Sequence, residues 1–258
     1  MSLPLNHGGV SLLSVDQMYE ADRLAVSAGT PSITLMENAC ETVVAEIRSR
    51  WSPRPILVLC GPGNNGGDGL GVATLLRQAR WPVKVALLGS SDAFAGDGAI
   101  MARRWGGPYV DFDPEQLCEF SLVVDALFGA GLRGPIEGRA RAMLHMAAQC
   151  ETEIIAVDVP SGLDADTGEI LGFAAESAVT VTFFRPKPGH ILLPGRDFVG
   201  ELVVADIGIP SSVLGEIKPK QCLNGPALWL QSWPDLSSDT HKYRRGHALV
   251  MGGGWFVT

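Results

Sequence analysis

Short apolar runs rich in β-branched residues alternate with helical patterns along most of this chain, and this alternation most constrains its fold. The runs are apolar almost throughout, which is typical of strands buried on both faces. Strands are expected at Pro55–Cys60, Val83–Leu88, Ser121–Ala126, Ile154–Asp158, Ala178–Phe183 and Glu201–Asp206. Helical patterns between them cover Gly67–Arg80, Gly98–Trp105 and Gly138–Gln149. This order predicts an α/β fold, a three-layer, doubly wound, mostly parallel sheet of Rossmann-like type.

Two further helices are expected before the first strand. The segment Ser14–Ala28 begins with Ser and Asp and ends before Gly29, which fits an N-cap at its start and a C-cap at its end. A second helix is expected over Thr34–Arg50.

The loop after the first strand of the sheet is the strongest candidate for a ligand site. It reads GPGNNGGDG over Gly61–Gly69, between a buried strand and a helix. A helix N-terminus offers free N–H groups to an anion, and glycines let a phosphate approach the backbone. The formal GxGxxG pattern is weak by itself, and no P-loop lysine follows it. Asn64, Asn65 and Asp68 can cap the helix, bind a ribose or ligate a hard cation, and the alternative is a capping turn without a ligand.

Two later strands end in aspartates. Asp125 precedes a glycine-rich loop, and Asp158 opens the segment DVPSGLDADTG, which contains Ser161. Ligands of open α/β sheets bind beyond the carboxyl ends of the strands, so these three residues are candidates for one crevice. The alternative for Asp125 is a turn-capping role.

Three weaker features have structural explanations that compete with a functional one. Asp164, Asp166 and Gly168 faintly resemble a calcium loop, but its later ligands are missing, so Asx turns are expected there. The basic segment Arg185–His190 can meet a phosphate, although a solvated loop is favoured. Glu37 and Asn38 interrupt an apolar helix, so they line a site or an interface, or have partners in the core.

The net charge and the composition of the chain argue against several classes of function. The chain of 258 residues has a net charge of -8, which argues against nucleic-acid binding. An anionic substrate must therefore be held by backbone amides, helix N-termini or a few local cations. The histidines show no metal-ligand spacing and no nucleophile elbow is present, which disfavours transition-metal catalysis and Ser-His-Asp hydrolysis.

The cysteines and the N-terminal segment bear on the cellular compartment. The five cysteines are scattered and odd in number, so buried free thiols and a reducing compartment are expected. They are Cys40, Cys60, Cys118, Cys150 and Cys222. The first residues lack the pattern of a secretory signal, and no stretch approaches a membrane span. We therefore expect a cytoplasmic protein without a membrane partner.

Together these segments resemble the NAD(P)H-hydrate epimerase family, from about Leu12 to Leu214 and in consistent order. The matching motifs are LMENA at Leu35–Ala39, GPGNNGGDG at Gly61–Gly69, VVDALFGAGLRGP at Val123–Pro135, DVPSGLDADTG at Asp158–Gly168, KPG at Lys187–Gly189 and DIGIP at Asp206–Pro210. The resemblance implies an isomerase that interconverts the R and S forms of hydrated NADH and NADPH (NADHX and NADPHX), with a potassium ion in its site. A homodimer is also compatible with it.

The resemblance also implies which residues form the site. Potassium ligands would be Asn65, Asp125 and Ser161, whose oxygen atoms are hard donors. Substrate contacts would come from Asn64, Asn65, Gly66, Gly67, Asp68, Gly129, Ala130, Gly131, Leu132, Arg133, Gly134, Pro135 and Asp158. Asp158 is our candidate for the catalytic acid–base, and Lys187 is its rival.

The strand–helix rhythm fails from about Pro219, and a domain boundary is placed near Asn224. Residues 1–223 would form the epimerase domain. In the tail, HKYRRGHALVMGG at His241–Gly253 resembles the opening of an ADP-dependent dehydratase domain of ribokinase-like fold. Residues 224–258 would then be a linker and the start of that domain, and we expect this chain to lack dehydratase activity unless it is a fragment of a longer protein.

Two other functions remain open from the sequence alone. A Rossmann-type NAD(P)-binding oxidoreductase would need an acidic residue at the end of its second strand, and Asp92 is only loosely placed for that role. A non-catalytic nucleotide-binding module on the same fold is the third hypothesis.

Overall fold

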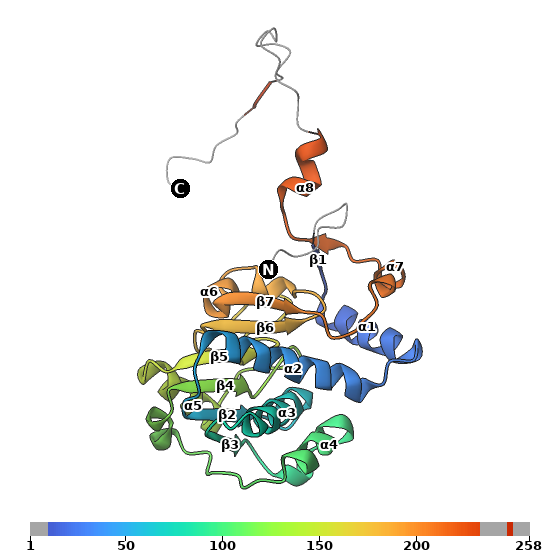
Figure 1. The fold of residues 1–258 in the computed structure, drawn as a ribbon. Helices are drawn as coiled ribbons and strands as arrows, with labels where there is room; N and C mark the ends of the chain where they lie inside the picture. Colours follow the sequence, from blue (N-terminus) through green and yellow to red (C-terminus); the bar gives the residue numbers. More distant parts are fainter. Residues whose placement is uncertain (1–9, 233–246, 250–258) are drawn as a thin grey trace.

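A six-stranded parallel sheet forms the centre of the computed structural model, which describes residues 10–232 and 247–249 (Figure 1). The strand order is β3-β2-β4-β5-β6-β7. The strands are β2 (Ile56–Cys60), β3 (Val83–Leu87), β4 (Leu122–Ala126), β5 (Glu153–Val157), β6 (Val179–Phe183) and β7 (Glu201–Ala205). The predicted fold class is confirmed, and each predicted strand ends within one residue of the observed one.

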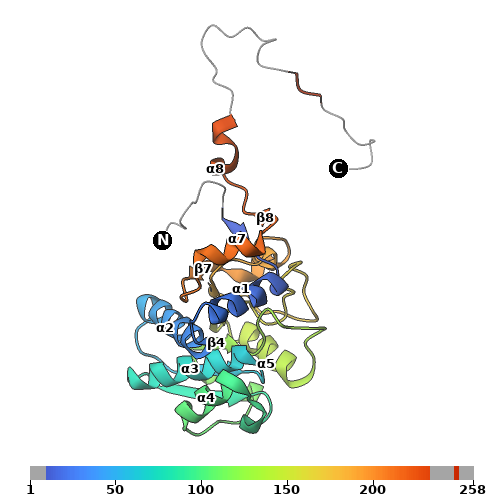
Figure 2. The ribbon, with the colours of Figure 1, turned by 90° about the vertical axis from the view of Figure 1, so that its right-hand side faces the viewer.

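Helices cover both faces of this sheet and complete a three-layer molecule (Figures 1 and 2). Successive residues of a strand face opposite sides, so Ile56 and Val58 pack into one core cluster and Leu57 and Leu59 into the other. The larger helices are α1 (Val15–Ser27), α2 (Ser32–Arg50), α3 (Asn64–Gln78), α4 (Gly96–Trp105) and α5 (Gly138–Gln149). The first cluster contains residues of α1 to α4, and the second contains the buried face of α5.

Helix α1 begins where the sequence predicts. The Ser14 hydroxyl accepts the Gln17 N–H at 3.3 Å, and the Gln17 side chain accepts the Ser14 N–H at 3.0 Å. This reciprocal pair is a capping box, which satisfies two of the free donors at the helix start. The helix ends at Ser27, before Gly29 with its positive φ of 104°.

The order of the strands creates a switch point beside β2. The chain leaves β2 to form β3 on one side and returns to form β4 on the other side. At such a point the loops after the two central strands diverge, leaving a crevice at their carboxyl ends. These loops begin at Gly61 and Leu127, the segments to which the sequence assigned a site.

A small two-stranded sheet was not predicted. The strands β1 (Ser11–Leu12) and β8 (Gln221–Cys222) pair in antiparallel fashion. Short helices α6 (Gly195–Val199), α7 (Leu214–Ile217) and α8 (Pro226–Trp229) complete the C-terminal part of the described chain. Most of the tail motif at 241–253 lies outside the described residues. No helix within the described ranges is both long and apolar enough to cross a membrane.

The expectation of free thiols is wrong for two cysteines. Cys118 and Cys150 form a disulfide, with their Cα atoms 5.4 Å apart. The turn Pro114–Glu119 lies against the end of α5, so the fold brings together two residues whose spacing in sequence carries no signal. Cys40 and Cys60 are buried free thiols as expected, and burial raises the pKa of both. The disulfide removes the support that free thiols gave to a reducing compartment.

Candidate functional site

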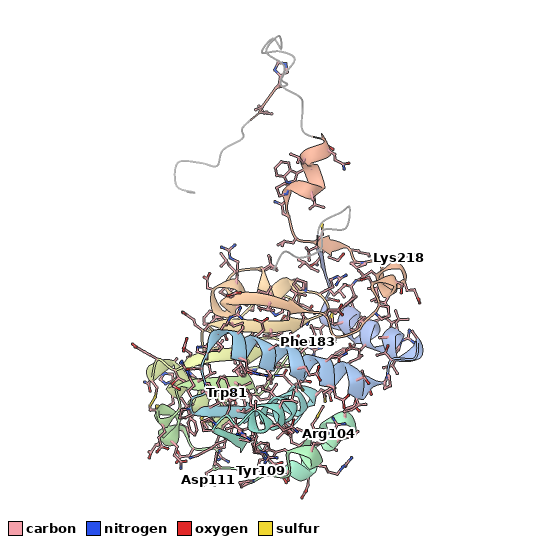
Figure 3. The ribbon with its side chains drawn as sticks, in the orientation of Figure 1. Trp81, Arg104, Tyr109, Asp111, Phe183 and Lys218 are labelled. Atoms are coloured by element: carbon pink, nitrogen blue, oxygen red, sulfur yellow. A yellow bond between two sulfur atoms is a disulfide. The ribbon has the colours of Figure 1, made fainter. Side chains whose placement is uncertain are left out.

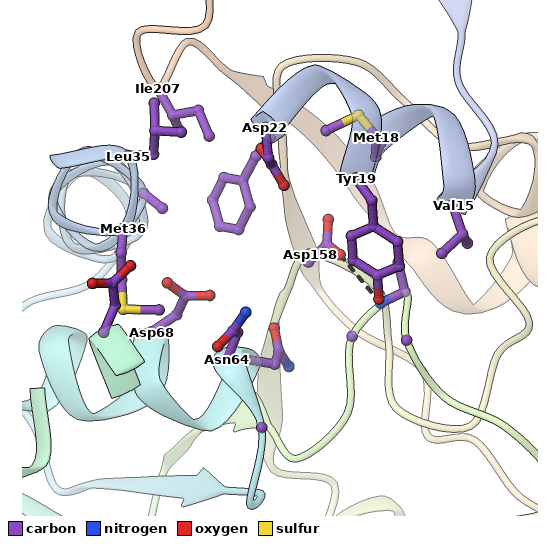
Figure 4. A pocket seen from close by; sticks show the side chains of 18 of the residues that line it. Val15, Met18, Tyr19, Asp22, Leu35, Met36, Asn64, Asp68, Asp158 and Ile207 are labelled. Atoms are coloured by element: carbon purple, nitrogen blue, oxygen red, sulfur yellow. Dashed lines mark hydrogen bonds between the residues drawn. The ribbon is translucent and has the colours of Figure 1, made fainter. Parts of the chain in front are cut away.

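A cavity of about 510 Å³ opens at the switch point, between the carboxyl ends of the strands and the helices α1 and α2 (Figure 4). Its volume is in the usual range for a small-molecule site. The loops after β2 and β4 form one part of the wall, and Asp158, Phe183 and Lys187 form another. Helices α1 and α2 contribute apolar side chains, including Met18, Leu35 and Met36.

The loop after β2 needs its glycines for close backbone packing. A Cβ atom on Gly61 would lie 1.8 Å from the carbonyl oxygen of Leu127, and one on Gly66 would lie 1.8 Å from that of Gly61. A side chain at Gly61 would push the two loops apart, and one at Gly66 would push the start of α3 away from Gly61. Helix α3 therefore starts directly at the crevice, with Asn64 and Asn65 as its first residues. The buried Nδ2 atom of Asn65 has no hydrogen-bond partner among the described residues.

Asp158 follows β5 and carries its carboxylate into the cavity. Its backbone adopts a positive φ of 66°, a conformation that Asp tolerates better than most residues. The Oδ1 atom accepts hydrogen bonds from the Lys187 ammonium at 2.5 Å and from the Thr182 hydroxyl at 3.0 Å. The Oδ2 atom accepts the backbone N–H of Ala130 at 3.2 Å. Every donor favours the ionised carboxylate.

The pKa of Asp158 follows from these contacts. Burial by itself raises this pKa, because it disfavours the charged form. The charge and hydrogen bond of Lys187 outweigh that effect and hold the pKa below its ordinary value. Asp158 is therefore an ionised carboxylate at neutral pH and is equipped to accept a proton.

His190 fixes the segment that carries Lys187. Its Nδ1 atom accepts the Lys187 backbone N–H at 3.0 Å. The proton must therefore sit on Nε2, which lies 2.9 Å from the Asp158 carbonyl oxygen and donates to it. Burial, together with the nearby Lys187 charge, lowers the pKa of His190 to about 4, so the ring is neutral.

Three further carboxyl groups line the cavity from other elements, and one of them is Asp97 of α4. Asp68 projects from α3 and Asp22 from α1, and Figure 4 shows both around the same open space as Asp158. Burial, reinforced by the charges of Asp158 and Asp22, raises the pKa of Asp68 well above its ordinary value. Burial also raises the pKa of Asp22 to about 6, although the Lys187 charge opposes this.

Asp125 and Ser161 lie next to the cavity rather than in its lining. The Ser161 hydroxyl and backbone N–H donate to the Asp125 carboxylate at 2.6 and 2.8 Å, and the Phe128 carbonyl oxygen lies 3.1 Å from the hydroxyl. Burial raises the pKa of Asp125, although these hydrogen bonds oppose it. No ion pair among the described residues neutralises this carboxylate, which is 2% exposed. Its oxygen-rich surroundings suit a hard cation.

Only some of the residues that the resemblance assigned to substrate binding line the cavity. Those that line the cavity are Asn64, Asn65, Asp68, Gly129, Ala130, Gly131 and Asp158. The others lie outside the lining: Gly66, Gly67, Leu132, Arg133, Gly134 and Pro135. Gly66 and Gly67 are packing positions in α3, whereas Arg133 to Pro135 are exposed on the loop beyond the cavity.

Three of the weaker sequence features are now explained. The solvated loop favoured for Arg185–His190 is wrong, because Lys187 is 1% exposed and ion-paired in the cavity wall. Glu37 and Asn38 both have partners within the fold. Glu37 forms an ion pair with Arg104 of α4, which Figure 3 labels. The Asn38 amide donates a hydrogen bond to the Ile207 carbonyl oxygen. The Asx turn at Asp164 is confirmed, since its Oδ1 atom accepts two backbone N–H groups at 2.8 and 2.9 Å. Asp166 differs from the expectation, because its Oδ1 atom accepts the Val15 N–H at the start of α1 at 2.9 Å.

Asp22 is the main site residue that the sequence reasoning missed. It lies four residues after Met18 and three before Ala25, so it shares the buried face of α1. A charged residue at such a position needs a reason, and this signal was available in the helical pattern. Asp92, which an oxidoreductase would need, is exposed and does not line the cavity.

A protein-family model and several known proteins match the part of the chain that contains these loops. The family model described as the YjeF-related protein N-terminus matches residues 32–189, which include α2, both divergent loops and Lys187. The chain belongs to this family. Within the YjeF-related N-terminal family, the chain is 37% identical over 203 residues to an NAD(P)H-hydrate epimerase of Oenococcus oeni, covering 76% of this chain and 96% of that protein.

Longer relatives match as well. The chain is 38% identical over 258 residues to a bifunctional NAD(P)H-hydrate repair enzyme Nnr of Moorella thermoacetica, covering 94% of this chain and 49% of the relative. The chain thus spans about half the length of such bifunctional relatives. A crystal structure of the yeast protein YNL200c has the same fold, with a TM-score of 0.66 at 23% identity over 82% of this chain and 96% of that one.

Proposed function

We propose that this protein is an isomerase that interconverts the R and S forms of NADHX and NADPHX. The observation that carries the proposal is the match to the Oenococcus oeni epimerase, which this chain covers over 96% of its length at 37% identity. The epimerase activity is assigned to residues 1–223, and residues 224–258 are proposed as a separate segment. The dehydratase activity is not part of the proposal.

The charged side chains that line the cavity indicate which part of the substrate binds inside it. Asp22, Asp68 and Asp158 face the interior, where Lys187 supplies the compensating cation. The diphosphate of a dinucleotide would be repelled by the ionised carboxylates of Asp22 and Asp158, so the uncharged hydrated ring belongs inside. The phosphates belong near the start of α3, where free N–H groups and the helix dipole favour anions. The exposed residues Arg133 to Pro135 are proposed contacts for the rest of the nucleotide.

The hydrated ring carries a hydroxyl on the carbon next to its nitrogen. The nitrogen lone pair can expel this hydroxyl and form a cationic iminium, and water can then add to the other face. A buried carboxylate stabilises the developing cation and accepts a proton from the incoming water. Asp158 is proposed as this catalytic group, because it is ionised, held by three donors and directed into the cavity.

A potassium ion is proposed next to this centre, with Asn65, Asp125 and Ser161 as its ligands. The fit rests on the buried carboxylate of Asp125, which has no cationic partner among the described residues, and on the oxygen atoms around it. Asn65 reaches the same region, since its Oδ1 atom lies 3.0 Å from where a Cβ on Gly129 would be. Such an ion supplies positive charge that holds the loops after β4 and β5 together.

A chiral assay of the two epimers tests the proposed function. Purified protein should equilibrate R- and S-NADHX, and the corresponding NADPHX forms, without ADP or ATP. The expected result is interconversion faster than in buffer at several potassium concentrations. Equal rates with and without protein would contradict the proposal. Redox turnover of NAD(P) would support an oxidoreductase, and binding without turnover a non-catalytic module.

A further inference from the structure

Asp68 is a buried carboxyl group for which the described part of the chain provides no partner. The residue is 9% exposed and lines the cavity, yet no hydrogen bond or ion pair among the described residues reaches its carboxylate. Its backbone carbonyl is used, since it accepts the Cys40 thiol at 3.3 Å. A polar side chain in such a position is costly unless a ligand completes it. The carboxyl group of Asp68 is therefore available to whatever occupies the cavity.

Asp68 and Asp158 reach the cavity from different elements. Asp68 projects from α3, whereas Asp158 extends from the end of β5, and an open space separates the two side chains in Figure 4. A planar ring bound in this space would have one carboxyl group on each side. The apolar side chains of Leu35 and Met36 flank the space on the α2 side and suit an uncharged ring.

An inversion of the proposed kind needs two proton-handling groups. The hydroxyl departs from one face of the ring and water adds to the opposite face, and a single rigid side chain does not serve both. This inference rests on the proposed function. We propose that Asp68 is a second catalytic residue, which handles the proton on the face of the ring opposite to Asp158.

The proton balance follows from this assignment. Protonated Asp68 donates its proton to the departing hydroxyl, the C–O bond breaks, and the electron pair leaves with the oxygen as water. The nitrogen lone pair forms the C=N bond of the iminium. A second water then attacks the other face, its electron pair forms the new C–O bond, and its surplus proton passes to Asp158. Proton exchange with water in the cavity then returns Asp68 to its protonated form and Asp158 to its ionised form before the next cycle. In the opposite direction Asp158 donates the proton and Asp68 accepts it.

The electrostatics of the site match this division of roles. The pKa of Asp68 is raised well above its ordinary value by burial and by the charges of Asp158 and Asp22. The pKa of Asp158 is lowered, because the Lys187 charge and hydrogen bond outweigh burial. Two carboxyl groups whose surroundings push their pKa values apart are the usual arrangement for an acid and a base in one site. Other titratable groups near Asp68 include the buried thiols of Cys40 and Cys60, and Asp97 of α4, which lines the same cavity.

The substitution Asp68→Asn tests the assignment, because it keeps the shape of the protonated carboxyl group but removes its acidic proton. We expect kcat for NADHX epimerisation to fall by about a hundredfold or more, with KM within about threefold of the wild-type value. Asp92→Asn is the matched control, since this carboxylate is exposed and does not line the cavity. Its kcat should equal that of the wild type.

A second variant distinguishes lost chemistry from a misfolded site. In Asp68→Ala, added formate should restore part of kcat, because the small acid can occupy the vacated space, whereas Asp68→Asn should not respond. Near-wild-type kcat in Asp68→Asn would overturn the assignment while leaving the proposed function intact. Failure of formate to rescue a folded Asp68→Ala would also overturn it. A wild-type protein without epimerase activity would overturn the proposed function itself.

Discussion

The Lys187 ammonium lies 2.5 Å from the Oδ1 atom of Asp158, and the two side chains form an ion pair with exposed fractions of only 2% and 15%. The pair joins the loop after β6 to the end of β5. His190 strengthens the link, because it hydrogen-bonds to the backbone of both residues. The pair therefore holds the proposed catalytic carboxylate in its ionised form and in a fixed direction.

Removing the cation of this pair should strongly destabilise the protein. We expect Lys187→Met to lower the free energy of unfolding by about 3–5 kcal/mol, because it leaves a buried carboxylate without its partner. Urea unfolding at pH 7 measures the change. Lys220→Met is the matched control, since Lys220 is exposed, and should change stability by less than about 0.5 kcal/mol. A similar small loss in Lys187→Met would show that the pair contributes little.

Neutralising Asp158 should remove catalysis rather than binding. Asp158→Asn should lower turnover by about a hundredfold or more, the usual scale for a general acid–base, while affinity for the hydrate changes little. Chiral assays and direct binding measurements separate the two effects. The double variant Asp158→Asn/Lys187→Met has neither buried charge and should unfold at a higher urea concentration than Lys187→Met alone. The double variant should still be inactive. Near-wild-type turnover in Asp158→Asn or in the double variant would show that Asp158 is a binding residue only.

Asp125 should control the response to potassium. We expect Asp125→Ala to weaken potassium binding and lower activity while the fold stays largely intact, because the residue ends a strand beside the cavity. Potassium titrations of activity and of thermal stability measure the effect. Asp92→Ala serves as the control and should keep the wild-type titration curve. An unchanged curve in Asp125→Ala would remove Asp125 from the ion site.

His190 should make the protein sensitive to mild acid. Its folded-state pKa is about 4, below the ordinary value of 6.5, because burial and Lys187 disfavour the charged ring. The unfolded chain therefore binds this proton first, so the contribution of His190 is full above pH 6.5 and is lost as pH falls towards 4. The free energy of unfolding should decrease over that window. The same curve measured for His190→Gln should lack most of this decrease, and identical slopes in the two proteins would contradict the assignment.

The C-terminal tail should be dispensable for epimerisation. Every proposed site residue precedes Asn224, and α8 carries exposed side chains throughout. Deleting residues 225–258 keeps the pairing of β8 with β1 and should leave kcat within about twofold of the full chain. The chiral assay and a thermal unfolding curve check this. A deletion variant that does not fold would show that the tail is part of the epimerase unit.

Local sequence patterns predicted most of the framework. Most of the six strands are apolar almost throughout and rich in β-branched residues, so their positions followed from the local sequence pattern. The start of α1 followed from Ser14 and its helix-capping chemistry. Helix α3 begins three residues earlier than expected, because Asn64, Asn65 and Gly66 have the composition of a loop. Tertiary packing against Gly61 compensates for their low helix propensity.

The sequence by itself determined the parallel sheet, the two divergent glycine-rich loops and the acidic residues at the strand ends, because each depends on neighbours along the chain. Only the tertiary structure decided the burial of Lys187, the place of Asp22 in the cavity and the Cys118–Cys150 pairing. These depend on partners distant in sequence. A lysine in a Pro- and Gly-rich segment resembles a solvated loop residue until the carboxylate that compensates its charge is brought beside it. Burial of an ionisable group is thus decided by its partners in space, which no local pattern specifies.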